Sequence, residues 1–272
     1  MVSPAPVRQA HSLMPLLDEK RLRTALRQCG RRTSTPGADR MTLGELRRRS
    51  VELLPRLAEQ LAEGTWQPGP VREVAFPTYT GKSMTVCVPT MIDRLVHRAL
   101  RNALEPVLET QVLADWVSGY RPRRNRITAL RQAAAHVDAG LRAVADVDVA
   151  SVSEDATVEQ VVDWCAQHVH DGTFLDRFRT ALSAMPYPVA PGSGLAPLLI
   201  NLRLSRSDAL LGGLRVVRFA DNYAAFATDA AEAYDAYSDI VDALARLGLR
   251  PNESKSRVRP HANVEDLFLI GG

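Results

Sequence analysis

Two apolar β runs that each carry carboxylates are the most constraining feature of this 272-residue chain. Residues 144–149 form a short apolar strand that contains Asp146 and Asp148, and residues 214–228 are typical of a hairpin with its turn at Asp221 and Asn222. Side chains alternate along a strand, so Asp146 and Asp148 share a face, and a hairpin beside them would present Asp221 nearby. The sequence therefore predicts a small sheet on which carboxylates converge.

Two interpretations of these carboxylates are open from the residues alone. Converging carboxylates suit paired Mg²⁺ ions, which take oxygen ligands and stabilise the attacking and leaving oxygens in phosphoryl transfer. Alternatively, Asp146 ends a strand and Asp221 with Asn222 forms an ordinary turn, for which these residue types are favoured.

Helical spacing alternates with β-rich runs along the rest of the chain, which predicts an α+β fold. Thr42 and Glu45 have the spacing of a capping box, and Gly64 ends the helix that they begin. The other expected elements are a helix around 12–29, a hairpin over 71–88, a long helix after Pro89 and helices over 158–170 and 232–247.

Charge is distributed unevenly although the net charge is only +3. Residues 1–131 hold 22 Lys and Arg against 12 Asp and Glu, whereas the remaining residues hold 12 against 19. This asymmetry fits a surface for a phosphate backbone beside an acidic metal region, and it equally fits solvated helix faces. No apolar run is long enough for a membrane helix and the N-terminus lacks a secretory signal, so we expect a cytoplasmic protein without a membrane partner.

A series of short motifs in a fixed order provides further context. Residues 89–94 match the P-T-x-x-D-R part of the pattern I-P-T-x-x-D-R, residues 119–124 resemble G-F-R-P-G-R, and residues 219–221 resemble the start of Y-A-D-D. Further matches in the same order lie at 35–42, 65–68, 99–106, 197–201, 248–255 and 268–269. From about residue 36 onward the chain resembles the reverse transcriptases of group II introns and their bacterial relatives.

The resemblance implies a right-hand polymerase fold of fingers and palm, in which helices back an antiparallel palm sheet, without a thumb. Residues 1–135 would form an N-terminal extension and the fingers, and residues 136–272 mainly the palm, with interleaved boundaries. Asp148 and Asp221 would bind Mg²⁺ or Mn²⁺, Asn222 would stand at the second aspartate of the hairpin, and Lys255 would lie near the departing pyrophosphate. Phe219 would pack beside this metal site, and an ordinary core aromatic is an equally compatible interpretation of this residue.

The resemblance also implies contacts to RNA or DNA and to the incoming nucleotide. Arginine can pair with phosphates through two hydrogen bonds, which suits the three arginines of the G-F-R-P-G-R match. The residues implied in these contacts are Lys82, Arg94, Arg121, Arg123, Arg124, Gly192 and Ser193.

Departures from the family pattern fall at contact positions. Asn222 replaces an aspartate, and Met84 stands where an arginine is expected to grip the triphosphate. The glutamine of the P-Q-G loop is missing from residues 191–194, and Ser153 replaces the bulky residue that screens out a 2′-hydroxyl.

These departures favour a nucleic-acid-binding protein with a weakened or inactive polymerase site that acts in a complex, where a protein partner would supply the thumb. An active RNA-directed DNA polymerase, or one with relaxed sugar selection, is the alternative. A fold used only for protein contacts is a third. The sequence leaves template, primer, oligomeric state and biological pathway open.

Overall fold

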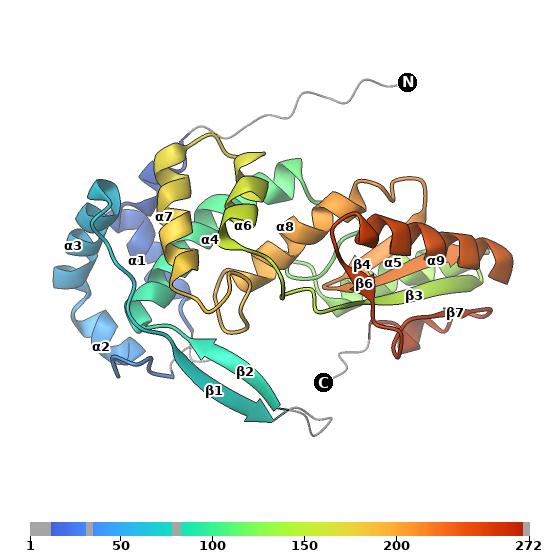
Figure 1. Cartoon of the computed structure of the whole chain (residues 1–272), viewed down its shortest axis with the longest axis horizontal. Helices are drawn as coiled ribbons and strands as arrows, with labels where there is room; N and C mark the ends of the chain where they lie inside the picture. The colour runs from blue at the N-terminus through green and yellow to red at the C-terminus, as the bar shows by residue number, and fades with distance from the viewer. Residues whose placement is uncertain (1–11, 31–34, 78–82, 269–272) are drawn as a thin grey trace. The chain divides into compact units, whose positions relative to one another are not determined.

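The structure is a computed structural model that describes residues 12–30, 35–77 and 83–268 (Figure 1). The chain forms two compact units that interleave in sequence. The first consists of Met1–Gln111 with Ser153–Leu199, and the second of Val112–Val152 with Ile200–Gly272. Helices and antiparallel strands occur together, which confirms the predicted α+β class.

The first unit is mainly helical. Asp18 caps its first α-helix by accepting a hydrogen bond from the Arg21 amide at 2.7 Å. A short 3₁₀ helix, Met14–Leu17, precedes that cap. The α-helices of this unit are α1 (Glu19–Gln28), α2 (Leu43–Arg48), α3 (Ser50–Glu63), α4 (Met91–Gln111), α6 (Val158–Ala166) and α7 (Gly172–Ser183).

The single helix predicted after Thr42 is two helices. Thr42 Oγ1 accepts from the Glu45 amide at 3.1 Å as predicted, and Gly64 ends α3 with a left-handed φ of 81°. Arg49 leaves helical geometry between α2 and α3, with ψ of 6°. The predicted apolar face is therefore interrupted, and Val51 is 76% exposed.

A two-stranded antiparallel hairpin also belongs to the first unit. It consists of β1 (Arg72–Pro77) and β2 (Ser83–Val88), and Phe76 lies directly opposite Met84. The Cys87 amide donates to the Pro191 carbonyl at 2.7 Å, which ties β2 to the loop at 190–194.

A five-stranded antiparallel sheet organises the second unit. Strands run in the order β4-β5-β3-β6, and β7 also pairs with β3. Their bounds are β3 (Ala143–Ala150), β4 (Arg215–Phe219), β5 (Asn222–Ala227), β6 (Arg250–Pro251) and β7 (Arg257–Arg259).

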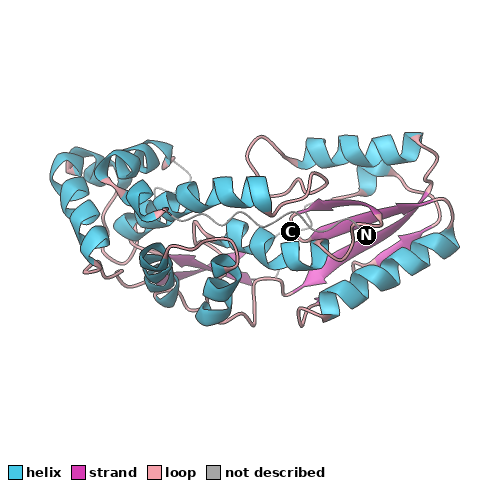
Figure 2. Ribbon diagram, turned by 90° about the horizontal axis from the view of Figure 1, so that it is seen from above, coloured by secondary structure: helices cyan, strands magenta, loops and turns pink. Residues whose placement is uncertain are grey.

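Helices cover both faces of this sheet, because α5 (Arg126–Asp138) and α9 (Ala230–Ala245) pack against residues of opposite parity (Figure 2). Val147 and Tyr223 face α9, and Val144 and Ala224 face α5. α8 (Ala196–Asp208) begins in the first unit and ends in the second. Among the described residues, no helix is both long and apolar enough to span a bilayer.

The turn of the β4–β5 hairpin lies one residue earlier than predicted. Phe219 pairs with Asn222, so the turn consists of Ala220 and Asp221. This register places Arg218 directly opposite Tyr223 on the α9 face, where both contact Asp208. A one-residue shift would move every side chain of β4 to the other face, so these polar contacts fix the register.

Gly119 allows the chain to approach this turn closely. The Ser118 amide donates to the Arg218 carbonyl at 2.8 Å, which lays residues 116–118 along the edge of β4. A Cβ atom on Gly119 would lie 1.9 Å from the Ala220 nitrogen. Only glycine fits here without displacement of the turn.

We expect Gly119→Ala to lower the free energy of unfolding by about 1–3 kcal/mol, because the added methyl group overlaps backbone atoms that cannot rotate away. Gly212→Ala is the matched control, since a Cβ atom there meets nothing within 4 Å. Urea denaturation of both variants measures the difference. Equal stability would contradict the close approach.

Candidate functional site

Three chain segments of the second unit meet at Asp148. On β3, Asp148 pairs with Asn222 of β5, beside the turn residue Asp221. The Val149 amide donates to the Asp221 carbonyl at 3.1 Å. From the third segment, the Asn252 amide donates to the Asp148 carbonyl at 2.7 Å. The peptide group that follows Asp148 is therefore held by two other segments.

The segment 252–256 also brings Lys255 to the site. Ser256 Oγ lies 3.1 Å from the Asp148 amide, which donates to it, and the Lys255 amide donates to the Asn252 carbonyl at 3.0 Å. Lys255 Nζ lies 3.7 Å from Asp148 Oδ2 and its side chain is 52% exposed. An ion pair this exposed contributes little to stability.

The site disfavours the ionised form of Asp221. Burial raises the pKa of the Asp221 carboxyl, and the Asp148 charge raises it further, whereas Lys255 and Arg218 oppose the shift. Two carboxylates that repel each other in a partly buried place are stabilised by a cation between them.

The donor set fits Mg²⁺ or Mn²⁺. Asp148 and Asp221 supply hard oxygen ligands, and Mg²⁺ is commonly held by one or two carboxylates while water and substrate phosphates complete its shell. Within the described part of the chain, no group of three or more His, Cys, Asp or Glu is placed to hold a metal. Asp148 and Asp221 would therefore hold the ion with ligands from outside the protein.

Asp146 has a structural role instead. Arg259 of β7 holds its carboxylate with Nη2 at 2.7 Å and Nε at 3.2 Å. Burial raises the pKa of Asp146, and the Arg259 contact opposes this shift. Asp146 and Asp148 do share a face of β3, as predicted, but Asp146 is engaged by an arginine.

The three arginines of the G-F-R-P-G-R match differ in their surroundings. Arg121 is 7% exposed and donates to the Ala114 and Val117 carbonyls at 2.6 and 2.8 Å. Arg124 contacts the carboxylate of Asp115 at 3.0 Å and also donates to the Asp115 carbonyl. Arg123 is exposed. Arg121 and Arg124 thus bind groups of their own loop and Arg123 faces solvent, while a contact of these arginines with phosphate stays a prediction.

The predicted contact residues of the first unit also contact protein groups. Arg94 donates to the Thr35 carbonyl, and burial lowers its pKa. Ser193 is buried, and its Oγ lies 3.5 Å from His97 Nδ1. A Cβ atom on Gly192, whose φ is 97°, would lie 2.0 Å from the Cys87 carbonyl oxygen. Lys82 lies outside the described residues.

Phe219 pairs across the hairpin with Asn222, which in turn pairs with Asp148. Its ring packs against Phe268 with centroids 6.2 Å apart. These contacts place the partly buried Phe219 against the core cluster on the α5 face of the sheet, two strands from Asp148.

The contacts of Arg259, Ser256 and Arg218 were not predicted from the sequence. Arg218 had a visible signal, since a charged residue interrupts the apolar run of β4. Such a residue in a buried strand requires a buried partner. Ser256 and Arg259 had no signal, because their partners lie more than a hundred positions away.

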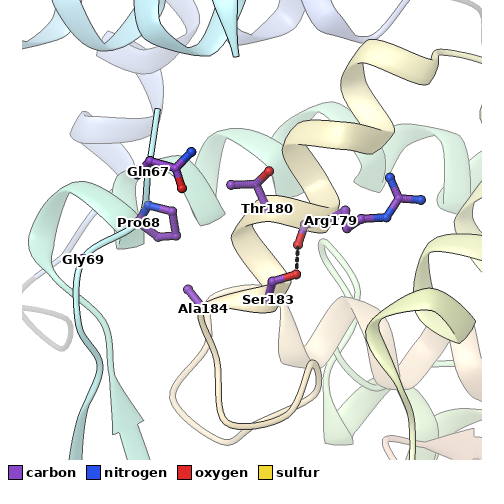
Figure 3. Close-up of a pocket in the computed structure, with 7 residues that line it drawn as sticks. All are labelled: Gln67, Pro68, Gly69, Arg179, Thr180, Ser183 and Ala184. Atoms are coloured by element: carbon purple, nitrogen blue, oxygen red, sulfur yellow. Dashed lines mark hydrogen bonds between the residues drawn. The ribbon is translucent and has the colours of Figure 1, made fainter. Parts of the chain in front are cut away.

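A pocket of about 430 Å³ in the first unit contains none of these residues (Figure 3). Its lining consists of Gln67, Pro68, Gly69, Arg179, Thr180, Ser183 and Ala184. Arg179 already pairs with Asp176 at 2.8 Å, and Ser183 Oγ donates to the Arg179 carbonyl at 2.9 Å. We assign no ligand to this pocket.

Comparison with known proteins gives partial similarities. The chain is 28% identical to Protein YkfC of Escherichia coli (strain K12) over 195 residues, 65% of this chain and 50% of YkfC. It is 35% identical to the group II intron-encoded protein LtrA of Lactococcus lactis subsp. cremoris over 83 residues, 30% of this chain and 14% of LtrA. No protein-family model matches the chain. The similarity to LtrA agrees in part with the resemblance found in the motifs.

Asp221→Asn should stabilise the protein at pH 7 in metal-free buffer, by roughly 0.5–2 kcal/mol, because it removes a charge that the site disfavours. Because the pKa of Asp221 is raised in the folded state, the folded wild-type protein binds this proton at a higher pH than the unfolded chain does. The difference between variant and wild type therefore shrinks as pH falls through the raised pKa, and disappears below the ordinary value of 3.8.

Thermal denaturation across this pH range measures the effect. Asp235→Asn, on the exposed side of α9, controls for loss of one negative charge. Destabilisation by Asp221→Asn at pH 7 would contradict the electrostatic description of the site.

Proposed function

We propose that this chain is a reverse-transcriptase-like protein that binds RNA or DNA, and that its polymerase site is weakened or inactive. The convergence of Asp148, Asp221 and Lys255 is the observation that carries the assignment. These residues come from three separate motifs of the family resemblance, and the second unit holds them in one place through the β3–β5 register and the 252–256 loop.

The surroundings of the carboxylates support the weakened site. Asn222 contributes no charge, and its Nδ2 lies 3.3 Å from Asp221 Oδ1, to which it donates. An amide that occupies a lone pair of Asp221 leaves that carboxylate fewer positions for metal. Asp146 is paired with Arg259, so it does not replace the missing negative charge.

The first unit supports the same conclusion. Met84 is 42% exposed on β2, where the family resemblance expects an arginine, and an apolar side chain gives no bond to a triphosphate. Ser193 is only 5% exposed, and its Oγ lies 3.5 Å from His97 Nδ1. The chain therefore keeps carboxylates for metal but few groups for nucleotide.

An active RNA-directed DNA polymerase is the second candidate, favoured by the Lys255 contact to Asp148. Bound Mg²⁺ would supply charge neutralisation at the attacking and leaving oxygens. Asp148 and Asp221 would bind the Mg²⁺, and the Lys255 ammonium would donate a proton to the departing pyrophosphate. A protein partner that supplies the function of the thumb stays a prediction.

Primer extension on RNA and DNA templates distinguishes a weakened or inactive polymerase site from an active polymerase. With dNTPs or rNTPs and Mg²⁺ or Mn²⁺, we expect little or no incorporation, because Met84 replaces an arginine expected to grip the triphosphate and Asn222 replaces an aspartate. Asp148→Ala combined with Asp221→Ala serves as the matched control. Efficient incorporation that this control abolishes would contradict the weakened site and establish the active polymerase; use of rNTPs would then assign sugar selection to Ser153.

Nucleic acid binding should depend on Arg123, whose side chain is exposed. We expect Arg123→Ala to weaken binding to RNA or DNA without much sequence preference and to lower the slope of log K against log salt by about 1. The free energy of unfolding of the Arg123→Ala variant should equal that of the wild type. Fluorescence anisotropy over a salt series gives both quantities.

Arg121→Ala is the structural counterpart. Because Arg121 holds two loop carbonyls from a buried position, its removal should cost about 1.5–3 kcal/mol of stability. For the Arg123 prediction, binding that is insensitive to salt, or that Arg123→Ala leaves unchanged, would contradict the proposal that Arg123 contacts nucleic acid.

A further inference from the structure

Arg218 is completely buried in β4, with 0% of its side chain exposed. A buried guanidinium costs free energy unless charged and polar partners satisfy it. It occupies the position directly opposite Tyr223, two residues before the turn of the hairpin. None of the roles considered above requires an arginine at this position, so its partners indicate what it does.

One side of Arg218 is bound by the end of α8. Nη2 lies 2.6 Å from Asp208 Oδ2, and Nε lies 3.1 Å from Oδ1, so the carboxylate is held at two points. Tyr223 donates its hydroxyl to Asp208 Oδ1 at 2.8 Å, and Ser207 Oγ lies 3.0 Å from the same hydroxyl. The ion pair is thereby satisfied within a closed polar cluster.

The other side of Arg218 is directed to the turn. Nη1 donates to the Ala220 carbonyl at 2.7 Å and to Asn201 Oδ1 at 3.0 Å. Asn201 Nδ2 donates in turn to the Gly119 carbonyl at 2.9 Å. Gly119 is the residue whose backbone touches Ala220. The cluster therefore holds the turn both directly and through the loop that lies against it.

The turn needs such support because Ala220 has a φ of 57°. A left-handed conformation is uncommon for a residue with a Cβ atom, and it persists where the surrounding structure enforces it. Ala220 precedes Asp221, so a turn that relaxed toward the ordinary region would redirect the Asp221 side chain.

We propose that the buried Arg218–Asp208 pair is a positioning device, which fixes the Ala220–Asp221 turn so that Asp221 is set beside Asp148 for a divalent cation. This inference rests on the proposed metal site. Arg218 contacts neither the cation nor substrate, and acts through the Ala220 carbonyl.

A role in stability alone would have different consequences. Loss of a buried ion pair weakens the whole unit, so every segment would open more often to a similar degree. A positioning role adds a local effect at the turn, beyond what the loss of global stability explains.

The test compares Arg218→Lys with Ile240→Ala. Lysine keeps the charge but cannot bind Asp208 at two points and also reach Ala220. Ile240 is fully buried on α9, so its truncation lowers stability without touching the turn. Asp208→Asn, which removes the negative charge of the pair while keeping the size of the side chain, replaces Arg218→Lys if that variant does not fold. Two measurements are made on each folded protein: Mn²⁺ affinity by electron paramagnetic resonance, and hydrogen exchange at the turn and in α9.

We expect Arg218→Lys to weaken Mn²⁺ binding roughly ten- to hundred-fold, as for other residues that orient metal ligands. Exchange should also rise more at residues 219–223 than in α9. Ile240→Ala should leave Mn²⁺ affinity unchanged and raise exchange evenly. Arg218→Lys that behaves like Ile240→Ala in both measurements would overturn the inference.

Failure of the metal site is distinguishable from failure of the positioning role. If wild-type protein binds Mn²⁺ no better than the Asp148→Ala, Asp221→Ala double variant, the proposed metal site is wrong. Hydrogen exchange then decides the role of Arg218 on its own: a selective rise at the turn supports control of the turn, and an even rise overturns it.

Discussion

The ion pair between Arg218 and Asp208 is the interaction on which the second unit depends. It joins the end of α8 to the end of β4 that lies next to the turn, and through Tyr223 it also fixes the register of β4 against β5. That register decides that Ala220 and Asp221 form the turn. A buried charge pair of this kind adds little net stability, but removal of one partner is costly, so the arrangement is specific.

At the candidate site, a backbone fixed by hydrogen bonds carries two carboxylates whose negative charges repel each other. Asp148 is held through its amide and carbonyl by Ser256 and Asn252, while its carboxylate lies near that of Asp221. Proteins commonly give up stability where function needs like charges together. The pairing of Asp146 with Arg259 shows the opposite treatment, in which a neighbouring carboxylate on the same strand is neutralised.

Local chemistry explains which features the sequence predicted. β3, the hairpin β4–β5, the Thr42 cap and the Gly64 helix end follow from alternation, capping and glycine, which act over a few residues. The turn position and the break at Arg49 were missed, because contacts with Asp208 and departures from helical geometry do not appear in apolar spacing. The loop contacts of Arg121 and Arg124 were missed for a similar reason: a family motif gives the residue type, whereas the loop carbonyls that they bind appear only in the fold.

A crystal structure of the protein soaked in Mn²⁺, with an anomalous difference map, tests the central claim most directly. If Asp148 and Asp221 form a cation site, the map should show a peak in contact with both carboxylates, and the peak should be lost in the Asp148→Ala, Asp221→Ala variant. Mn²⁺ peaks at other carboxylates would show that the ion entered the crystal. A map with such peaks but with none between Asp148 and Asp221 would contradict the claim.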